Sequence, residues 1–260
     1  MPDNSYRTIR ALLASQRPED IQKGLRLVAI EIAKIGSSEA RPLFEMVSTL
    51  FYIDVLDRPE LVPVIDEAVN LAASLGVWVI PVLIDNLDAG DIKAQWAIAH
   101  VLGRIGVVAI DPMLNAYAST NDSTRQAFIV YALGKIKSPE IVKAATTVLA
   151  AMKSDQVELR DTATRALGKL IESIPPANLP EELKLQFMKS LLHNLSDNNA
   201  SVRSKAVRSI GKMAKHGHLS AAEREQLKAC CFRLLGNDED GEWDRAFIVR
   251  KETEEALKYI

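Results

Sequence analysis

Aromatic residues are scarce in this chain. They make up 5% of its 260 residues, whereas hydrophobic residues as a whole make up 48%. The apolar content is therefore mainly alanine, leucine, isoleucine and valine, which suits helices that pack closely through small side chains. Glycine and proline, with 12 and 11 copies, are also few and stand at punctuating positions. The composition favours an all-helical fold.

Cysteine is also rare, and its placement argues against a disulfide. The two cysteines, Cys230 and Cys231, are neighbours in the sequence. Neighbouring residues of a helix point about 100° apart, so we expect both thiols to be free, as in a reducing cytoplasm. The opening Met-Pro-Asp-Asn-Ser lacks the basic and apolar regions of a signal peptide. The most apolar stretch, residues 77–84, is too short for a membrane span. We therefore expect a cytoplasmic protein without a membrane partner.

An excess of charge of either sign is absent as well. The 32 basic and 34 acidic residues give a formal net charge of −2. Bulk charge therefore supports no polyanion-binding function, because that function needs a basic excess or a local basic patch.

A short phrase recurs between residues 101 and 213: an aliphatic residue, a glycine, a cation and another apolar residue. Its glycines, at positions 103, 134, 168 and 211, recur at intervals of 31, 34 and 43 residues. These intervals are within or near the periods of helical-repeat families. Ile35-Gly36 and Leu75-Gly76 resemble earlier degenerate copies, and Ala256-Leu257-Lys258 resembles a last copy in which lysine replaces glycine.

The apolar pattern around these phrases predicts helix pairs. Polar residues that can cap a helix, such as Asp91, Asp122, Ser154, Asp155 and Asn199, precede the second helix of a pair. The acidic run at residues 238–242 is expected to cap the last helix in the same way. The predicted pairs are 6–15 with 18–35, 40–55 with 60–75, 77–87 with 91–105, 110–118 with 123–136, 140–152 with 156–171, 181–195 with 200–215, and 221–235 with 242–259.

A single helix pair cannot bury its apolar face, so the pairs must stack on one another. The prediction is one domain over residues 1–260, an all-α, right-handed α-solenoid of about seven antiparallel helix pairs. The repeats are clearest over residues 77–215 and degenerate over 1–76 and 216–260. The core face of the second helices is predicted to contain Leu102, Leu133, Leu167 and Ile210.

The cap aspartates, Arg160, Arg203 and the Ala-Leu-Gly-Lys phrase resemble HEAT repeats. The likeness is greatest to the short repeats of bacterial and archaeal HEAT-like proteins of the phycobilin-lyase type. That family includes scaffolds, lyase subunits and a branch of alkylpurine DNA glycosylases. The aspartate and tryptophans of the glycosylase branch have no matching constellation here, and no bilin site is apparent. Fold analogy alone does not transfer an activity.

Two columns of side chains accompany the phrase, three residues before and one residue after each glycine. Residues four apart lie on one face of a helix, so stacked repeats would align these side chains into a stripe. HEAT resemblance implies that second helices line the concave surface, which would make the stripe a basic and partly aromatic groove. Together with the nearby Trp96, the predicted partner-binding residues are Trp96, His100, Arg104, Tyr131, Lys135, Arg165, Lys169, Arg208 and Lys212.

Helix stability and core packing, rather than partner binding, can also explain the same residues. Cations near the C-terminal end of a helix stabilise it by about 0.3–1 kcal/mol through the helix dipole. Most tryptophans at helical spacing belong to a core. Counted from Gly36 and Gly76, the corresponding N-terminal positions are Ala33, Ser37, Ala73 and Val77, so the stripe is not expected to extend there.

Other chemistry finds little support in the sequence. The Gly-Lys pairs lack the preceding glycine of a phosphate-binding loop and stand near helix ends, so packing explains them better. His216, His218 and the two cysteines have no recognised metal-ligand spacing. We therefore expect no catalytic, cofactor-binding or metal-binding residues and no cofactor, and an enzymatic role is left open but disfavoured.

The sequence favours a non-enzymatic scaffold or adaptor whose concave stripe binds an acidic segment of another protein. Binding of nucleic acid along the same stripe is the first alternative, and a lyase-like or cofactor-handling subunit is the second. The sequence does not identify the partner, the oligomeric state or the face that is used.

Overall fold

The computed structural model describes residues 2–88, 90–237 and 241–260. Within these ranges all regular secondary structure is helical, as predicted. The α-helices are α1 (Pro2–Leu13), α2 (Pro18–Ile35), α3 (Arg41–Ser48), α4 (Val62–Ala73), α5 (Val79–Asp85), α6 (Ile92–Ile105), α7 (Ile110–Ala118), α8 (Ser123–Leu133), α9 (Ala145–Ala151), α10 (Val157–Ser173), α11 (Glu181–Asn194), α12 (Ala200–Lys215), α13 (Ala221–Leu235) and α14 (Phe247–Leu257). Odd numbers mark the first helix of each predicted pair and even numbers the second.

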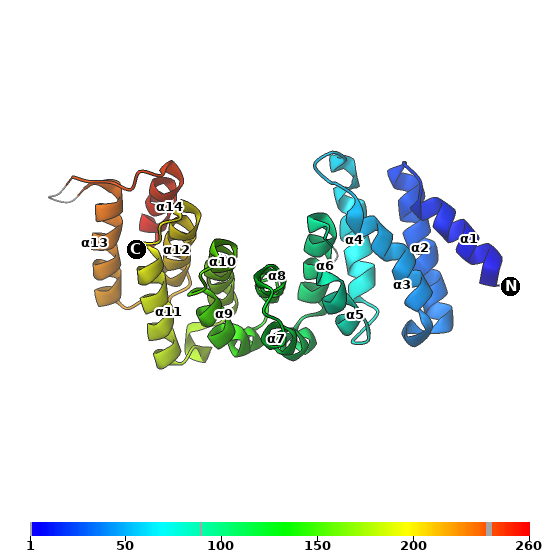
Figure 1. The fold of residues 1–260 in the computed structure, drawn as a ribbon, viewed down its shortest axis with the longest axis horizontal. Coiled ribbons are helices and arrows are strands. Elements are labelled where there is room, and N and C mark those ends of the chain that lie inside the picture. The colour runs from blue at the N-terminus through cyan, green and yellow to red at the C-terminus, as the bar shows by residue number, and fades with distance from the viewer. Residues whose placement is uncertain (1, 89, 238–240) are drawn as a thin grey trace. The chain divides into compact units, whose positions relative to one another are not determined.

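The chain forms two compact units, residues 1–116 and residues 117–260. The first contains α1 to α6 and most of α7, and the second contains α8 to α14 (Figure 1). The prediction of a single domain over the whole chain stays a prediction.

In the first unit the second helices α2, α4 and α6 form a row, with α4 in contact with both others. Asp91 caps α6 as predicted, since its carboxylate accepts hydrogen bonds from the backbone N–H groups of Lys93 and Ala94 at 2.8 and 3.2 Å. Trp78 packs edge-on against Phe44 with ring centroids 6.0 Å apart. This tryptophan therefore has the core role that is usual at helical spacing.

In the second unit α8, α10, α12 and α14 form a row in which each helix contacts the next (Figure 1). The first helices α9, α11 and α13 each pack against the second helix of their pair. The predicted core column is confirmed in both units, because Leu102, Leu133 and Leu167 are fully buried and Ile210 is 2% exposed. A stripe of aliphatic side chains on each helix thus supplies most of the buried apolar surface.

The phrase glycines let successive second helices approach closely. A Cβ atom at Gly211 would lie 3.0 Å from the Cα and Cβ atoms of Ala256 on α14, and one at Gly168 would lie 3.2 Å from the Cβ atom of Ser209 on α12. Both distances are shorter than comfortable van der Waals contact. Packing between repeats therefore accounts for these glycines.

A ladder of partly buried ion pairs links the same helices. The guanidinium of Arg160 donates to the carboxylate of Asp197 at 2.9 and 3.3 Å, and that of Arg203 donates to Asp244 at 2.6 and 2.8 Å. Each arginine also donates to the carbonyl oxygen six residues before it, on Ser154 and Asp197 respectively. The two arginines on which the HEAT resemblance rests therefore join each repeat to the next.

Three sequence predictions need correction. The last helix begins at Phe247 rather than at 242, with Ala246 at its N-cap and no side-chain cap, so Glu242 does not cap it. Residues 238–240 of that acidic run lie outside the described residues. The second correction concerns the start of α10, where Ser154 and Asp155 were predicted to cap the helix. The N-cap residue is Gln156, which makes no side-chain cap, and Ser154 Oγ instead accepts the backbone N–H of Gln156 at 3.1 Å.

The third correction concerns the register of the N-terminal repeats. Gly36 has a positive φ of 86° and ends α2, just as Gly106, with a φ of 82°, ends α6. Left-handed backbone of this kind favours glycine at a helix C-terminus. Gly36 therefore corresponds to Gly106 rather than to Gly103, and the columns assigned from Ile35-Gly36 were displaced by three residues.

The outer face of α14 differs from that of the inner second helices. Lys258 stands where α8, α10 and α12 have glycine, and it is exposed together with Lys251, Glu254 and Glu255. Helix α14 therefore lacks the glycine at which the preceding second helices make close contact.

Among the described residues no single helix has the length and hydropathy needed to cross a membrane. Residues 92–105 and 107–118 meet that criterion only as a pair, and the chain bends by 118° between them.

Candidate partner-binding surface on the second helices

The predicted stripe is divided between the two units. Trp96, His100 and Arg104 lie on α6 in the first unit. The six others lie in the second unit, with Tyr131 on α8, Lys135 just after it, and the remaining four on α10 and α12: Arg165, Lys169, Arg208 and Lys212.

In the first unit the cation of the stripe is already paired. The guanidinium of Arg104 forms an ion pair with the carboxylate of Asp66 on α4 and donates to the carbonyl oxygen of Asp66 at 2.8 Å. Trp96 is 46% exposed on the same helix, and His100 is half-buried. Arg104 therefore connects two repeats, and little of its charge remains for a partner.

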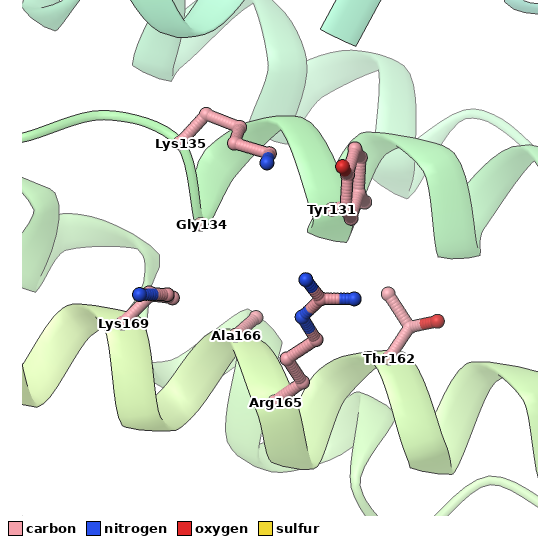
Figure 2. A pocket seen from close by; sticks show the side chains of 7 residues that line it. All are labelled: Tyr131, Gly134, Lys135, Thr162, Arg165, Ala166 and Lys169. Atoms are coloured by element: carbon pink, nitrogen blue, oxygen red, sulfur yellow. The ribbon is translucent and has the colours of Figure 1, made fainter. Parts of the chain in front are cut away.

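In the second unit an open pocket lies between α8 and α10 (Figure 2). The residues that line it are Tyr131, Gly134, Lys135, Thr162, Arg165, Ala166 and Lys169. The Nζ atom of Lys135 lies 4.5 Å from the centroid of the Tyr131 ring, and the Cζ atom of Arg165 lies 5.7 Å from it. Figure 2 shows the guanidinium of Arg165 extending from α10 towards the ring on α8. Both distances fit cation–π contacts, so the ring positions two cations at once.

Three cations line this α8–α10 pocket, and one of them, Lys169, forms an ion pair with Glu172. Among the residues that the structure describes, neither Lys135 nor Arg165 forms an ion pair with an aspartate or glutamate. Arg165 is exposed and Lys135 is half-buried. The positive charge in this pocket is therefore open to an anion from outside.

A second hollow, the α10–α12 groove, adjoins the pocket and shares Arg165 and Lys169 with it. Its volume is about 560 Å³, a part of which is open solvent. The residues that line it are Arg165, Lys169, Glu172, Lys205, Arg208, Ser209 and Lys212. We call the pocket and the groove together the basic surface.

Acidic side chains compensate much of the charge in the α10–α12 groove. The two carboxylate oxygens of Glu172 accept hydrogen bonds from Lys169 and Lys212, at 2.8 and 3.0 Å. Lys205 pairs with Asp161 on α10, and Arg208 pairs with Glu252 on α14. Six cations of the basic surface thus face three carboxylates, and an excess of positive charge remains.

The titration of Glu172 and Lys212 follows from their surroundings. Burial alone would raise the pKa of Glu172, but the hydrogen bonds from Lys169 and Lys212 outweigh burial and lower it. Burial lowers the pKa of Lys212, although Glu172 opposes that change. Hydrogen bonding outweighs burial at Glu172 because this carboxylate has two lysine partners. Burial prevails at Lys212 because this ammonium shares one carboxylate with Lys169 and lies near the positive charge of Arg208. Glu172 is therefore ionised at neutral pH.

The helix dipole explains only part of the stripe. Arg104 and Lys212 stand in the last turn of their helices, but the last turn of α10 contains no basic residue. Arg165 and Lys169 lie further inside α10, where the dipole has little effect. These two cations need another explanation.

Sequence reasoning missed the acidic members of this surface and Lys205. Glu172 follows Lys169 by three residues, a spacing that places both on one helix face, so a local signal was present. Asp161 and Glu252 reach Lys205 and Arg208 from helices about forty residues away, and no local spacing indicates those contacts.

Two further titratable groups with shifted pKa values, His218 and Cys231, lie in the packed interior. His218 is buried with its Nε2 atom 3.1 Å from the carbonyl oxygen of Ile171, and burial lowers its pKa. Burial raises the pKa of Cys231 to about 11, and both cysteines are free thiols. Over residues 2–88, 90–237 and 241–260 no three His, Cys, Asp or Glu side chains are placed to hold a metal ion.

Comparison with known proteins identifies the repeats. The HEAT-repeat family matches residues 80–168, and the family of C-terminal HEAT repeats of GCN1-like proteins matches residues 126–227. No curated protein sequence matches the chain significantly.

Several solved structures are similar in fold. The karyopherin Kap121p bound to the SUMO protease Ulp1p matches with a TM-score of 0.65 and 13% identity, over 100% of this chain and 30% of that one. The structure of the CpcE–CpcF complex of phycocyanin lyase from Nostoc sp. PCC7120 matches with a TM-score of 0.53 and 19% identity. The match covers 68% of this chain and 97% of that one. A designed armadillo repeat protein in complex with the peptide (KR)4 matches with a TM-score of 0.50 and 17% identity, over 96% and 97%.

At these identities the likeness concerns the fold alone. The two family matches together extend from residue 80 to residue 227, a range that contains the phrase glycines and the Arg160–Asp197 pair. This chain is therefore a HEAT-like repeat protein with an α-solenoid fold.

Proposed function

We propose that this protein is a binding scaffold that holds an acidic segment of another protein on the basic surface of residues 117–260. The observation that carries the proposal is the pair of cations, Lys135 and Arg165, that flank Tyr131 in an open pocket and form no ion pair with a carboxylate among the described residues. Cations of this kind attract an anionic group, and an adjacent ring adds apolar contact.

A peptide suits this surface better than a nucleic acid does. Nucleic-acid binding depends on many cations that are free to meet successive phosphates. Here Glu172, Asp161 and Glu252 already compensate cations of the α10–α12 groove, and a phosphate chain passing over it would meet these carboxylates. An extended peptide can instead place one acidic side chain in the α8–α10 pocket.

The known uses of similar folds support a protein partner. HEAT and armadillo repeats are typical protein-binding scaffolds, and the matched karyopherin and designed armadillo protein were both solved with a bound protein or peptide. Stacked repeats provide a long row of second helices on which an extended segment can lie. A cytoplasmic location, which suits the two free cysteines, is part of this proposal.

The test uses the full-length protein and a fluorescein-labelled decaglutamate peptide, with decaglutamine as the uncharged control. Fluorescence anisotropy at low and at physiological salt is expected to show binding of decaglutamate only, and binding should weaken as salt screens the charges. The variant Lys135→Gln/Arg165→Gln/Lys169→Gln should weaken it by roughly tenfold, since the partly exposed cations that line the α8–α10 pocket are removed.

A matched control separates the surface from net charge. Lys153, Lys189 and Lys251 are exposed and lie outside the basic surface. Their triple replacement by glutamine removes the same charge and should leave the affinity within about twofold. Equal losses in both triple variants, or no binding of decaglutamate, would refute the proposal. Tighter binding of a 20-base-pair DNA duplex with a steep salt dependence would indicate a nucleic-acid partner instead.

A further inference from the structure

The two parts of the basic surface differ in how their charge is compensated, and this difference supports an inference that rests on the proposed function. We infer that the α8–α10 pocket receives the acidic side chain of the partner, whereas Glu172 occupies the α10–α12 groove as an internal anion. Glu172 thereby limits how many acidic side chains the surface can bind.

Glu172 is positioned as a bound carboxylate would be. It uses one oxygen for Lys169 on its own helix and the other for Lys212 on the neighbouring helix. Its side chain is 30% exposed, and that of Lys212 is 16% exposed. A carboxylate of a peptide could reach the same two ammonium groups only by displacing this one.

The equivalent position beside the α8–α10 pocket has no carboxylate. Glu172 follows the phrase glycine Gly168 by four residues, and the residue four after Gly134 is Ser138. The hydroxyl of Ser138 accepts the backbone N–H of Glu140 at 3.3 Å, at the start of the next turn. Lys135 and Arg165 therefore have no internal acid at the position that Glu172 takes beside the groove.

The consequence is that removal of Glu172 should improve binding. The substitution Glu172→Gln keeps the shape of the side chain and leaves Lys169 and Lys212 without a carboxylate. The affinity for labelled decaglutamate is expected to rise by about three- to tenfold, the effect of one or two additional charge contacts. Such a gain of function is hard to produce by damage to the fold.

Two control variants distinguish this effect from net charge. Glu158→Gln removes an exposed acid from the same helix but outside the groove, and it should change the affinity by less than about twofold. Glu172→Gln/Lys212→Gln has the net charge of the wild type but frees Lys169, so it should still bind more tightly than the wild type. Equal gains in Glu172→Gln and Glu158→Gln would attribute the effect to net charge and overturn the inference.

A measurement on the wild-type protein tests the same inference without relying on variants that could misfold. In an NMR titration of the wild type with decaglutamate, the amide signals of Tyr131, Lys135 and Arg165 are expected to shift more than those of Arg208 and Lys212. Equal or larger shifts at Arg208 and Lys212 would overturn the inference while leaving the proposed function in place. Absence of any binding by the wild type would overturn the proposed function and the inference with it.

Discussion

Arg203 and Asp244, 41 residues apart in the sequence, meet through two parallel hydrogen bonds of 2.6 and 2.8 Å between α12 and the segment that leads into α14. Their side chains are only 17% and 6% exposed. The same arrangement joins Arg160 to Asp197 one repeat earlier. Charge-assisted, bidentate pairs of this kind hold neighbouring repeats in a defined register.

Removal of one partner should therefore destabilise the second unit. Replacement of Asp244 by asparagine removes the carboxylate that the partly buried guanidinium of Arg203 pairs with. The expected loss in free energy of unfolding is about 2–3 kcal/mol, somewhat below the usual range for fully buried pairs. Urea denaturation followed by circular dichroism measures it. Glu254→Gln, an exposed neutralisation on α14, is the control and should change stability by less than about 0.5 kcal/mol.

The second prediction concerns the phrase glycines: replacement of glycine by alanine should change stability by different amounts at equivalent positions. Gly211→Ala should destabilise by about 1–3 kcal/mol, because the new methyl group would press on the backbone of Ala256. Gly134→Ala should have a smaller effect, since its Cβ atom would lie 3.4 Å from the nearest atoms of Ala166. Thermal unfolding of both variants tests this order, and equal melting temperatures would contradict it.

The stability of the protein should decrease in acid. The hydrogen bonds from Arg160 and Arg203 lower the pKa of Asp197 and of Asp244, against the opposing effect of burial. A carboxylate whose pKa is lower in the folded state stabilises the fold above its ordinary value of 3.8, and this contribution disappears as the pH falls through the lowered value. The melting temperature should therefore decline below about pH 4. The Asp197→Asn/Asp244→Asn variant should show a shallower decline, and an unchanged slope would contradict the assignment.

Tyr131 allows a test of how the α8–α10 pocket is organised. Tyr131→Phe keeps a ring between Lys135 and Arg165, so the affinity for decaglutamate should stay within about twofold. Tyr131→Leu keeps apolar volume but removes the ring, and it should weaken binding by about threefold, which corresponds to one cation–π contact. Anisotropy titrations of the two variants compare them directly. Equal affinities would mean that the ring contributes packing alone.

Sequence patterns alone were sufficient for the architecture. The recurrence of Gly134, Gly168 and Gly211 indicated the repeat, the caps at Asp91 and Asn199 marked helix starts, and the apolar period identified the core. These features are readable because helix formation and capping depend on residues within four positions of one another. The register of the degenerate repeats was harder to predict. A glycine that ends a helix, such as Gly36, cannot be distinguished by sequence alone from a glycine at a contact between two helices.

Charge pairing, in contrast, was decided by the tertiary structure. The sequence indicated a column of cations, but it did not indicate that Glu252 compensates Arg208 or that Asp161 compensates Lys205. Those contacts join helices about forty residues apart and depend on the rotation and rise from one repeat to the next. For the same reason only the folded chain distinguishes Lys135 and Arg165, which have no carboxylate partner among the described residues, from Lys212, which Glu172 already holds.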